Sequence, residues 1–362
     1  MHRPEGHRIV ENTATIGKID AVPVDPQVTS PRSAPRSGPF CLSVIAPMFN
    51  EEGSVLAFLD ELLPVLEGLT DRFEVICVDD GSRDRTAAMV AARAVIDPRI
   101  SLIEFSRNFG KEAALSAGFD HAASDAVVVI DADLQQPPAK IAEMVALWRK
   151  GWDIVNCRRD NREVDSALRA SLSTRFYKLY NRIAEMPIPT ETSDFRLLDR
   201  SAVDALLGLP ERSRFMKGLF AWVGFSAVSI SYRHRDRHAG SSSFRLWRLW
   251  NFALDGITAF STLPLRVWSY LGFTVAFIAF FYGAITIFKA LFFGIDVPGY
   301  ASLLTAVLFL GGVQLISLGI LGEYVGRILI ETKDRPLYIV RSTINLDGAR
   351  SPMAKGDTSD AA

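Results

Sequence analysis

Short apolar runs alternate with longer stretches of helical periodicity along the first two thirds of the chain. The apolar runs are rich in branched residues and lie at residues 42–47, 73–78, 100–105, 126–130 and 153–157. Between them, stretches with a helical spacing of apolar positions lie near residues 51–69, 84–96, 111–123 and 139–150. This alternation is typical of βαβ units, in which helices cover both faces of a mostly parallel sheet. The pattern therefore predicts an α/β domain with a Rossmann-like sheet.

The predicted α/β domain covers residues 39–243 and carries two further elements. A helix is expected at about residues 163–186, and a strand near residues 225–230. The two ends of the chain differ from the domain, because residues 1–38 and 348–362 are polar and lack periodicity. Such composition does not bury enough apolar surface to order a segment, so both ends are predicted to be disordered tails.

Two uncharged, mostly apolar stretches follow the domain, at residues 267–288 and 297–322. Each is long enough to cross a hydrocarbon core of roughly 30 Å at about 1.5 Å per residue. Basic residues flank the pair on the outside, whereas the connection between the stretches is nearly neutral, which predicts that both ends are cytoplasmic. We therefore expect a two-span anchor in the cytoplasmic (inner) membrane over residues 265–326, followed by a cytoplasmic segment over residues 327–347. A helical hairpin buried in a soluble core is the alternative.

Residues 244–264 are predicted to form an amphipathic helix between the domain and the anchor. Polar side chains share one helical stripe, formed by Arg245, Arg248, Asn251 and Asp255. Apolar side chains share the other side, formed by Trp247, Trp250, Leu254 and Ile257. A basic helix that carries Trp can lie in the plane of the membrane interface. The alternative is an ordinary helix that faces the protein core.

Composition excludes some classes of function. Lys and Arg number 40 against 41 Asp and Glu, so the net charge of −1 gives no reason to expect nucleic-acid binding. The three cysteines show no zinc spacing and lie in or beside apolar runs, which predicts reduced thiols of a cytosolic domain. The N-terminus has no apolar segment of the secretory type, so we expect the domain to stay on the cytoplasmic side.

Carboxylates follow three of the predicted strands. Asp131 and Asp133 come directly after the fourth strand, and Asp79 and Asp80 follow the second. The first strand contains Pro47 and leads into Asn50 and Glu51. In an open α/β sheet, ligands bind outside the carboxyl ends of the strands. Two carboxylates there suit Mg²⁺ or Mn²⁺ bound together with substrate phosphates, although an isolated Asp-x-Asp is also found in solvated turns. The three acidic strand ends together predict a pocket for a sugar nucleotide.

Several motifs resemble those of known glycosyltransferases. Family 2 glycosyltransferases with the GT-A fold have sequences similar to Pro47-Met-Phe-Asn-Glu51, Val78-Asp-Asp-Gly-Ser82 and Asp131-Ala-Asp-Leu-Gln135. More narrowly, polyisoprenyl-phosphate glycosyltransferases have sequences that resemble Ser106-Arg-Asn-Phe-Gly-Lys111, Asp131-Ala-Asp-Leu-Gln-Gln-Pro-Pro138, Asp194-Phe-Arg-Leu197 and Arg237-His-Ala-Gly-Ser-Ser-Ser-Phe244. The resemblance covers about residues 40–335 and is strongest to the bactoprenol glucosyltransferase type, with dolichol-phosphate mannose synthase in the same group.

The resemblance implies roles for residues that bind the donor. The donor-binding set consists of Pro47, Asn50, Glu51, Asp79, Asp80, Lys111, Asp131, Gln135, Arg237 and Ser241. Within it, Asp131 holds the metal together with Asp133, and Gln135 lies on the metal or on a phosphate. The loop around Ser241 would close over the diphosphate, or would be a plain linker. Phe49 and Ser243 depart from the family, which usually has Tyr and often Lys at these positions.

The acceptor that the resemblance implies is a polyprenyl phosphate. Its second pKa of about 6 leaves the nucleophile mostly deprotonated at neutral pH, so no strong base is required. Arginines are needed instead to bring two anions together. Arg159 and Arg169 match positions associated with the acceptor phosphate, although a solvated basic face is the alternative. Asp194 matches the family's candidate base and acts as a base, orients the acceptor or pairs with Arg196.

The predicted reaction is a metal-dependent displacement at the anomeric carbon with inversion. Glucose from UDP-glucose is the expected sugar, and GDP-mannose or an aminosugar nucleotide is the alternative donor. Asp133, Asp194, Arg159 and Arg169 form the expected catalytic set. A processive polysaccharide synthase needs more than two spans, and a non-catalytic scaffold would not need the acidic motifs. The resemblance also implies a homo-oligomer, with a tetramer as one form; Gly322 and Gly326 have a spacing that allows close helix packing between copies or between the two spans.

Overall fold

The computed structural model describes residues 22–23, 30–159, 192–212, 214, 216–232, 263–293 and 299–346. Within these residues the strands form one sheet, in the order β1-β8-β6-β7-β5-β2-β3-β4-β9. The strands are β1 (Val22–Pro23), β2 (Leu42–Met48), β3 (Phe73–Asp79), β4 (Ile100–Phe105), β5 (Ala126–Val129), β6 (Ile154–Arg159), β7 (Thr192–Asp199), β8 (Ala227–Tyr232) and β9 (Val340–Ile344). Six of them, β2 to β6 and β8, match the strands that the sequence pattern predicts.

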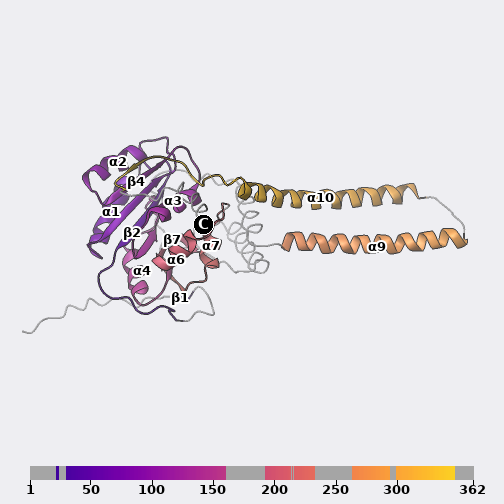
Figure 1. Cartoon of the computed structure of the whole chain (residues 1–362), viewed down its shortest axis with the longest axis horizontal. Helices are drawn as coiled ribbons and strands as arrows, with labels where there is room; N and C mark the ends of the chain where they lie inside the picture. Colours follow the sequence, from indigo (N-terminus) through magenta and orange to yellow (C-terminus); the bar gives the residue numbers. More distant parts are fainter. Residues whose placement is uncertain are drawn as a thin grey trace, which may run out of the picture.

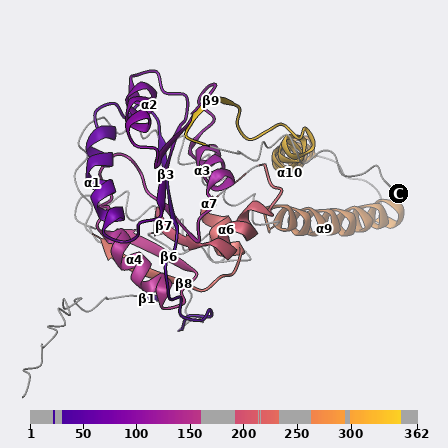
Figure 2. The ribbon, with the colours of Figure 1, turned by 60° about the vertical axis from the view of Figure 1, so that its left-hand side comes forward.

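Helices cover both faces of the sheet (Figure 1, Figure 2). The helices of the α/β domain are α1 (Val55–Glu67), α2 (Thr86–Ile96), α3 (Lys111–His121), α4 (Lys140–Arg149), α6 (Arg200–Leu207) and α7 (Met216–Trp222). One core cluster joins the sheet to α1, α2 and α4, and the other joins it to α3, α6 and α7. In β2 the side chain of Val44 belongs to the first cluster and that of Ile45 to the second. Burial on both faces explains why the apolar runs are continuous. The predicted GT-A-like α/β architecture is therefore confirmed.

The parallel part of the sheet lies at its centre. Strands β5, β2, β3 and β4 pair in parallel, and so do β6 and β8. Strand β7 lies between β5 and β6 and runs antiparallel to both, while β9 pairs antiparallel with β4 and forms the edge of the sheet. The sequence pattern did not predict β7 or β9. Strand β9 has three exposed residues at its centre, so it lacks the apolar pattern that marks a strand in sequence.

Residues 30–38, which were expected to belong to a disordered tail, lie against the domain. The N–H of Arg36 donates to the carbonyl of Arg149 over 2.8 Å, and the Arg36 guanidinium pairs with Asp153 at 2.9 Å and Asp199 at 3.0 Å. Ser33 Oγ also donates to Asp153 over 2.6 Å. Polar contacts rather than apolar burial attach this segment, which explains why its composition resembles that of a tail.

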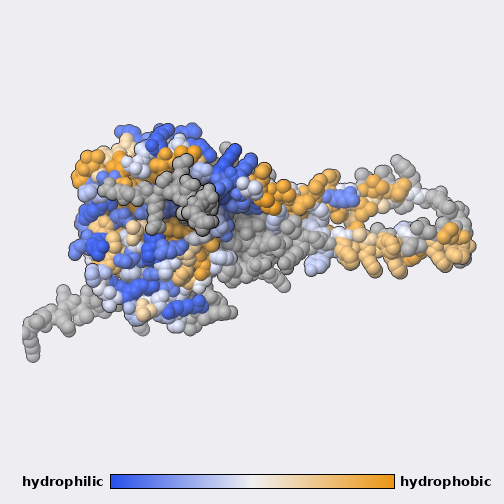
Figure 3. Space-filling view, in the orientation of Figure 1, coloured by the Kyte–Doolittle hydropathy of each residue, from blue (hydrophilic) through white to orange (hydrophobic). Residues whose placement is uncertain are grey.

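Two long helices project from the domain side by side (Figure 1). They are α9 (Leu263–Phe293) and α10 (Tyr300–Thr332), which contain the first predicted span and residues 300–322 of the second. Apolar side chains such as Phe280 and Leu315 are more than two-thirds exposed, and apolar surface extends along both helices (Figure 3). Among the described residues, one stretch, Phe309–Thr332, is long and apolar enough to cross a membrane, and α9 contains a shorter apolar stretch at Tyr270–Gly283. Exposed apolar surface of this extent marks an interaction site rather than a water-facing surface.

Candidate active site

The acidic strand ends lie on one rim of the sheet. Strands β2, β3 and β5 are parallel neighbours, so Pro47, Asp79 and Asp131 all lie at or just beyond their carboxyl ends. Met48 pairs with Asp79 in register, and the N–H of Asp80 donates to the Met48 carbonyl over 2.9 Å. The topology therefore brings together the three acidic motifs that the sequence places far apart.

Asp79 and Asp80 are buried at the end of β3. Asp79 Oδ2 accepts from the Ser82 N–H at 3.0 Å, while Asp79 Oδ1 has no hydrogen-bond partner. Asp80 accepts from the N–H groups of Phe109 at 2.6 Å and Gly110 at 3.0 Å. Burial raises the pKa of both carboxyls. An unsatisfied buried oxygen is costly, so Asp79 Oδ1 is suited to accept a hydrogen bond from a ligand.

A glycine makes this turn possible. Gly81 has φ +68°, and a Cβ there would lie 2.4 Å from the Arg107 carbonyl carbon. The β3–α2 turn therefore packs directly on the backbone of the β4–α3 loop, which supplies the N–H groups to Asp80.

Asn50 and Glu51 join the β2–α1 loop to the β3–α2 loop. Asn50 has φ +57°, its side-chain oxygen accepts from the Arg83 N–H at 2.9 Å, and its own N–H donates to Ser82 Oγ at 2.9 Å. The Glu51 N–H donates to Thr86 Oγ1 at 2.8 Å. These bonds fix the two loops against each other on the rim where the sequence predicts the nucleoside.

Asp131 and Asp133 follow β5 and offer the carboxylate oxygens that Mg²⁺ or Mn²⁺ prefers. Asp131 Oδ2 accepts from Gln136 Nε2 at 2.8 Å, and the Asp131 N–H donates to Gln136 Oε1 at 3.0 Å. Asp133 Oδ1 accepts from the Gln135 N–H at 3.1 Å. Gln136, which the sequence analysis did not single out, is therefore the glutamine that contacts Asp131.

The carboxylates of Asp131 and Asp133 fit a divalent cation that takes its remaining ligands from the substrate. Within the described residues, His, Cys, Asp and Glu form no group of three or more placed to hold a metal. Mg²⁺ is bound through one or two carboxylates together with substrate phosphates, and Asp131 and Asp133 would supply the two carboxylates.

Lys111 links the metal motif to Asp194. Its Nζ lies 2.6 Å from Asp131 Oδ1 and 2.7 Å from Asp194 Oδ2, and Lys217 Nζ lies 3.8 Å from Asp194 Oδ1. Burial opposes ionisation of Asp194, but Lys111 and Lys217 outweigh it and hold the pKa of this carboxyl well below its usual range. A carboxylate so strongly held is a weak proton acceptor, so the geometry favours an orienting role over that of a base.

Two other titratable groups lie beside Asp194. Burial, together with the charge of Asp194, raises the pKa of Glu112 to about 7. Burial lowers the pKa of Arg196 to about 10, and its guanidinium lies 3.9 Å from the centre of the Phe220 ring. Arg196 donates to the backbone carbonyls of Ser193 and Asp194, so these bonds replace the predicted side-chain pair with Asp194. Glu112 and Lys217 are site residues that the sequence reasoning missed.

The expected acceptor residues are only partly described. Strand β6 runs in the same direction as β5, so Arg158 and Arg159 at its end belong to the acidic rim, next to Asp194 at the start of β7. Arg169 and the predicted donor residues Arg237 and Ser241 lie outside the described residues, as do residues 244–262 of the predicted amphipathic helix.

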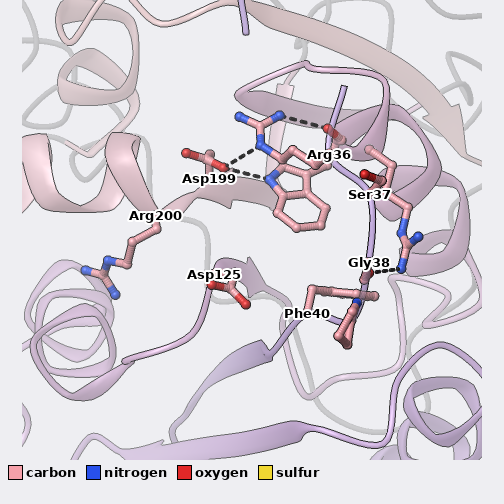
Figure 4. Close-up of a pocket in the computed structure, with 10 residues that line it drawn as sticks. Arg36, Ser37, Gly38, Phe40, Asp125, Asp199 and Arg200 are labelled. Carbon is pink, nitrogen blue, oxygen red and sulfur yellow. Dashed lines mark hydrogen bonds and ion pairs between the residues drawn. The ribbon is translucent and has the colours of Figure 1, made fainter. Parts of the chain in front are cut away.

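A separate hollow of 310 Å³ lies at the opposite end of the sheet (Figure 4). Its lining includes Arg36, Phe40, Asp125 and Asp199, which lie before β2 or β5 or at the end of β7. Arg36 and Trp148 both bond to Asp199 there. None of the predicted site residues lines it, so the acidic rim remains the candidate active site.

Comparison with known proteins identifies the family. Residues 43–207 match Glycosyl transferase family 2, and residues 263–328 match the GtrB C-terminal hairpin. The chain is 48% identical to an uncharacterized glycosyltransferase of Synechocystis sp. over 306 residues, which is 84% of this chain and 96% of that protein. It is 47% identical to the SfII prophage-derived bactoprenol glucosyl transferase of Shigella flexneri over 302 residues, which is 83% of this chain and 98% of that protein.

Among solved structures, a mannosyltransferase from Pyrobaculum calidifontis is 18% identical, with a TM-score of 0.44 over 88% of this chain and 90% of that one. The family assignment depends on the sequence matches, which cover both the α/β domain and the helical hairpin. The chain is therefore a glycosyltransferase of family 2 and belongs with the members that carry the GtrB C-terminal hairpin.

Proposed function

We propose that this enzyme transfers a hexose from a nucleotide sugar to polyprenyl phosphate, with UDP-glucose and undecaprenyl phosphate as the substrates. The observation that carries the proposal is a single rim of the sheet that bears the buried Asp79 and Asp80 after β3, and Asp131 with its partner Lys111 after β5. The similarity to bactoprenol glucosyl transferases over most of both chains supports the sugar and the acceptor. GDP-mannose or an aminosugar nucleotide is the alternative donor.

The donor would bind along the rim. Asp79 and Asp80 would contact the nucleoside, within the frame that Pro47, Asn50 and Glu51 provide. Asp131 and Asp133 would hold Mg²⁺ or Mn²⁺, with Gln135 on the ion or on a phosphate. The loop that contains Arg237 and Ser241 would close over the donor diphosphate. A bound divalent cation would neutralise charge on the nucleotide diphosphate as it leaves.

The acceptor phosphate would approach from the β6–β7 side. Arg159 and Arg169 would bind its oxygens, and Asp194 would orient it through Lys111 and Lys217. Because the phosphate is already ionised at neutral pH, the protein has to position it rather than deprotonate it. A single displacement at the anomeric carbon then inverts its configuration.

The hairpin would anchor the enzyme where this lipid resides. We propose that α9 and α10 span the cytoplasmic membrane, with residues 244–264 at the interface and both chain ends in the cytoplasm. The exposed apolar surface of the two helices supports this arrangement. A homo-oligomer, of which a tetramer is one form, would bury part of that surface.

The test is transfer by the purified full-length protein. The enzyme is incubated in detergent with undecaprenyl phosphate, Mg²⁺ or Mn²⁺ and either UDP-glucose, GDP-mannose or UDP-N-acetylglucosamine, and the lipid is analysed by mass spectrometry. We expect a hexose adduct with UDP-glucose, and its loss on chelation of the metal. A protein that neither transfers nor hydrolyses any of the donors would be a scaffold, and the proposal would then be abandoned.

A further inference from the structure

The segment after the second long helix returns to the α/β domain. Residues 340–344 form β9, which pairs with β4 and is the edge strand of the sheet. Figure 2 shows β9 back at the domain after α10. Just before this strand, the Ile339 carbonyl accepts from the N–H of Ser106 over 2.9 Å. Ser106 is the first residue of the β4–α3 loop, so the chain that leaves the hairpin is bonded to the start of that loop.

Tyr338 makes the second attachment. Its side chain is buried, and its ring is stacked on Phe105 with the centroids 5.0 Å apart. Phe105 in turn contacts Phe109 edge-on at 5.7 Å. The Tyr338 hydroxyl donates to Asp120 Oδ2 over 2.8 Å, and Asp120 lies near the end of α3.

The two structures that Tyr338 contacts both lead to the acidic rim. Phe109 and Gly110 donate the N–H groups that hold the Asp80 carboxylate. Lys111, at the start of α3, holds Asp131 and Asp194. A displacement of α3 or of the β4–α3 loop would therefore move both groups relative to the rest of the site.

We infer that Tyr338 is a positioning residue for the nucleotide subsite, and that the segment after the hairpin sets the geometry at Asp80. This inference depends on the proposed function, because it takes Asp80 as part of the donor site. Removal of the Tyr338 hydroxyl leaves the ring stack on Phe105 but releases α3 from the segment. The consequence is a less ordered loop at Asp80, and hence weaker nucleotide binding.

The experiment compares UDP binding to full-length variants by isothermal titration calorimetry in the presence of Mn²⁺. We expect Tyr338→Phe to weaken UDP binding by about three- to tenfold, the size expected for one lost hydrogen bond. The KM for the sugar nucleotide should rise by the same factor. Asp120→Asn keeps an acceptor for the hydroxyl and should bind UDP like the native protein.

A control distinguishes positioning from general stability. Asn345 attaches the far end of the same segment, with Nδ2 donating to the carbonyls of Ala94 and Ile100. Asn345→Ala should lower the thermal unfolding midpoint at least as much as Tyr338→Phe, yet leave UDP binding unchanged. Equal losses of UDP binding in both variants would reduce Tyr338 to a structural role and overturn the inference.

A further variant separates this inference from the proposed function. Asp80→Ala should abolish UDP binding. Native binding in Asp80→Ala would remove the proposed donor site itself. Loss of binding in Asp80→Ala together with native binding in Tyr338→Phe would overturn only the inference about Tyr338.

Discussion

Lys111 Nζ lies 2.6 Å from Oδ1 of Asp131, so an ammonium group of the protein already engages the carboxylate that we propose for the metal. The other oxygen of Asp131 accepts from Gln136 at 2.8 Å. A divalent cation that binds Asp131 therefore competes with Lys111, which retains Asp194 as a partner at 2.7 Å. The Lys111–Asp131 pair thus links metal binding to the position of Lys111, which also contacts Asp194 on the proposed acceptor side of the site.

Replacement of Lys111 tests this competition. We expect Lys111→Met to strengthen Mn²⁺ binding in the absence of nucleotide by about tenfold. This change corresponds to about 1.4 kcal/mol, roughly a third of the ~4 kcal/mol interaction energy of two unit charges about 4 Å apart at an effective dielectric constant of about 20. Electron paramagnetic resonance of free Mn²⁺ measures the change. The exposed residue Lys150 provides the control, and Lys150→Met should bind Mn²⁺ like the native protein. Weaker binding in Lys111→Met would show that Lys111 supports the metal site instead of competing with the ion.

The metal motif itself is tested by Asp133→Ala. Transfer should fall by at least about 100-fold, because charge on the leaving diphosphate is no longer neutralised. The variant should still fold and fractionate with membranes, since Asp133 lies in a loop at the rim. Product formation from UDP-glucose measures transfer. Asp204 is an exposed residue of α6, and Asp204→Ala serves as the matched control. Unchanged turnover in Asp133→Ala would discard the metal assignment.

Periodicity predicted the strands that are buried on both faces, because their apolar residues are continuous. It could not predict β7 and β9, whose sequences, Thr192–Asp199 and Val340–Ile344, mix polar and apolar side chains. Their places in the sheet depend on pairing with β5 and β4, which are distant in the chain. The return of the chain from the hairpin to the sheet edge was missed for this reason.

Individual site residues could be predicted from the motif that contains them. Contacts between residues of different motifs could not, because they depend on the fold. Lys111, Asp131 and Asp194 were each singled out from motifs, but their contact requires the antiparallel β5–β7 pair. Leu134 has φ +61°, and this turn after Asp133 decides which glutamine points back at Asp131. Spacing alone did not separate Gln135 from Gln136.

The raised pKa of Glu112 predicts a specific pH dependence of stability. Because the folded state holds a proton up to a pKa of about 7, against an ordinary value of 4.5, it binds more protons than the unfolded state between these values. Stability therefore falls as the pH rises from about 4.5 to 7, by at most about 3 kcal/mol. Glu112→Gln removes this loss, so the variant should match the native protein near pH 4 and exceed it at pH 8.

Thermal unfolding of the full-length protein at several pH values measures the effect of Glu112→Gln. The amide oxygen can still accept from the Met216 N–H, which lies 3.3 Å from the native carboxylate. Loss of this hydrogen bond is therefore not expected to obscure the result. A destabilisation of the same size at every pH would contradict an uncharged Glu112 in the folded state.

Arg36 tests whether the segment before β2 is a structural part of the domain. Its guanidinium pairs with Asp153 and Asp199, and Asp153 is almost fully buried. Arg36→Ala leaves these carboxylates without their cation, so the free energy of unfolding should fall by about 2 kcal/mol. Tryptophan fluorescence during urea unfolding measures the loss.

Arg32 lies in the same segment and donates one exposed hydrogen bond to the Gly224 carbonyl, so Arg32→Ala should change stability by less than about 0.5 kcal/mol. Since Arg36 lies at the end of the sheet opposite the acidic rim, both variants should keep native kcat and KM at temperatures where they are folded. Native stability in Arg36→Ala would mean that the segment is dispensable for folding. A lower kcat with native stability would instead assign the hollow around Arg36 a part in transfer.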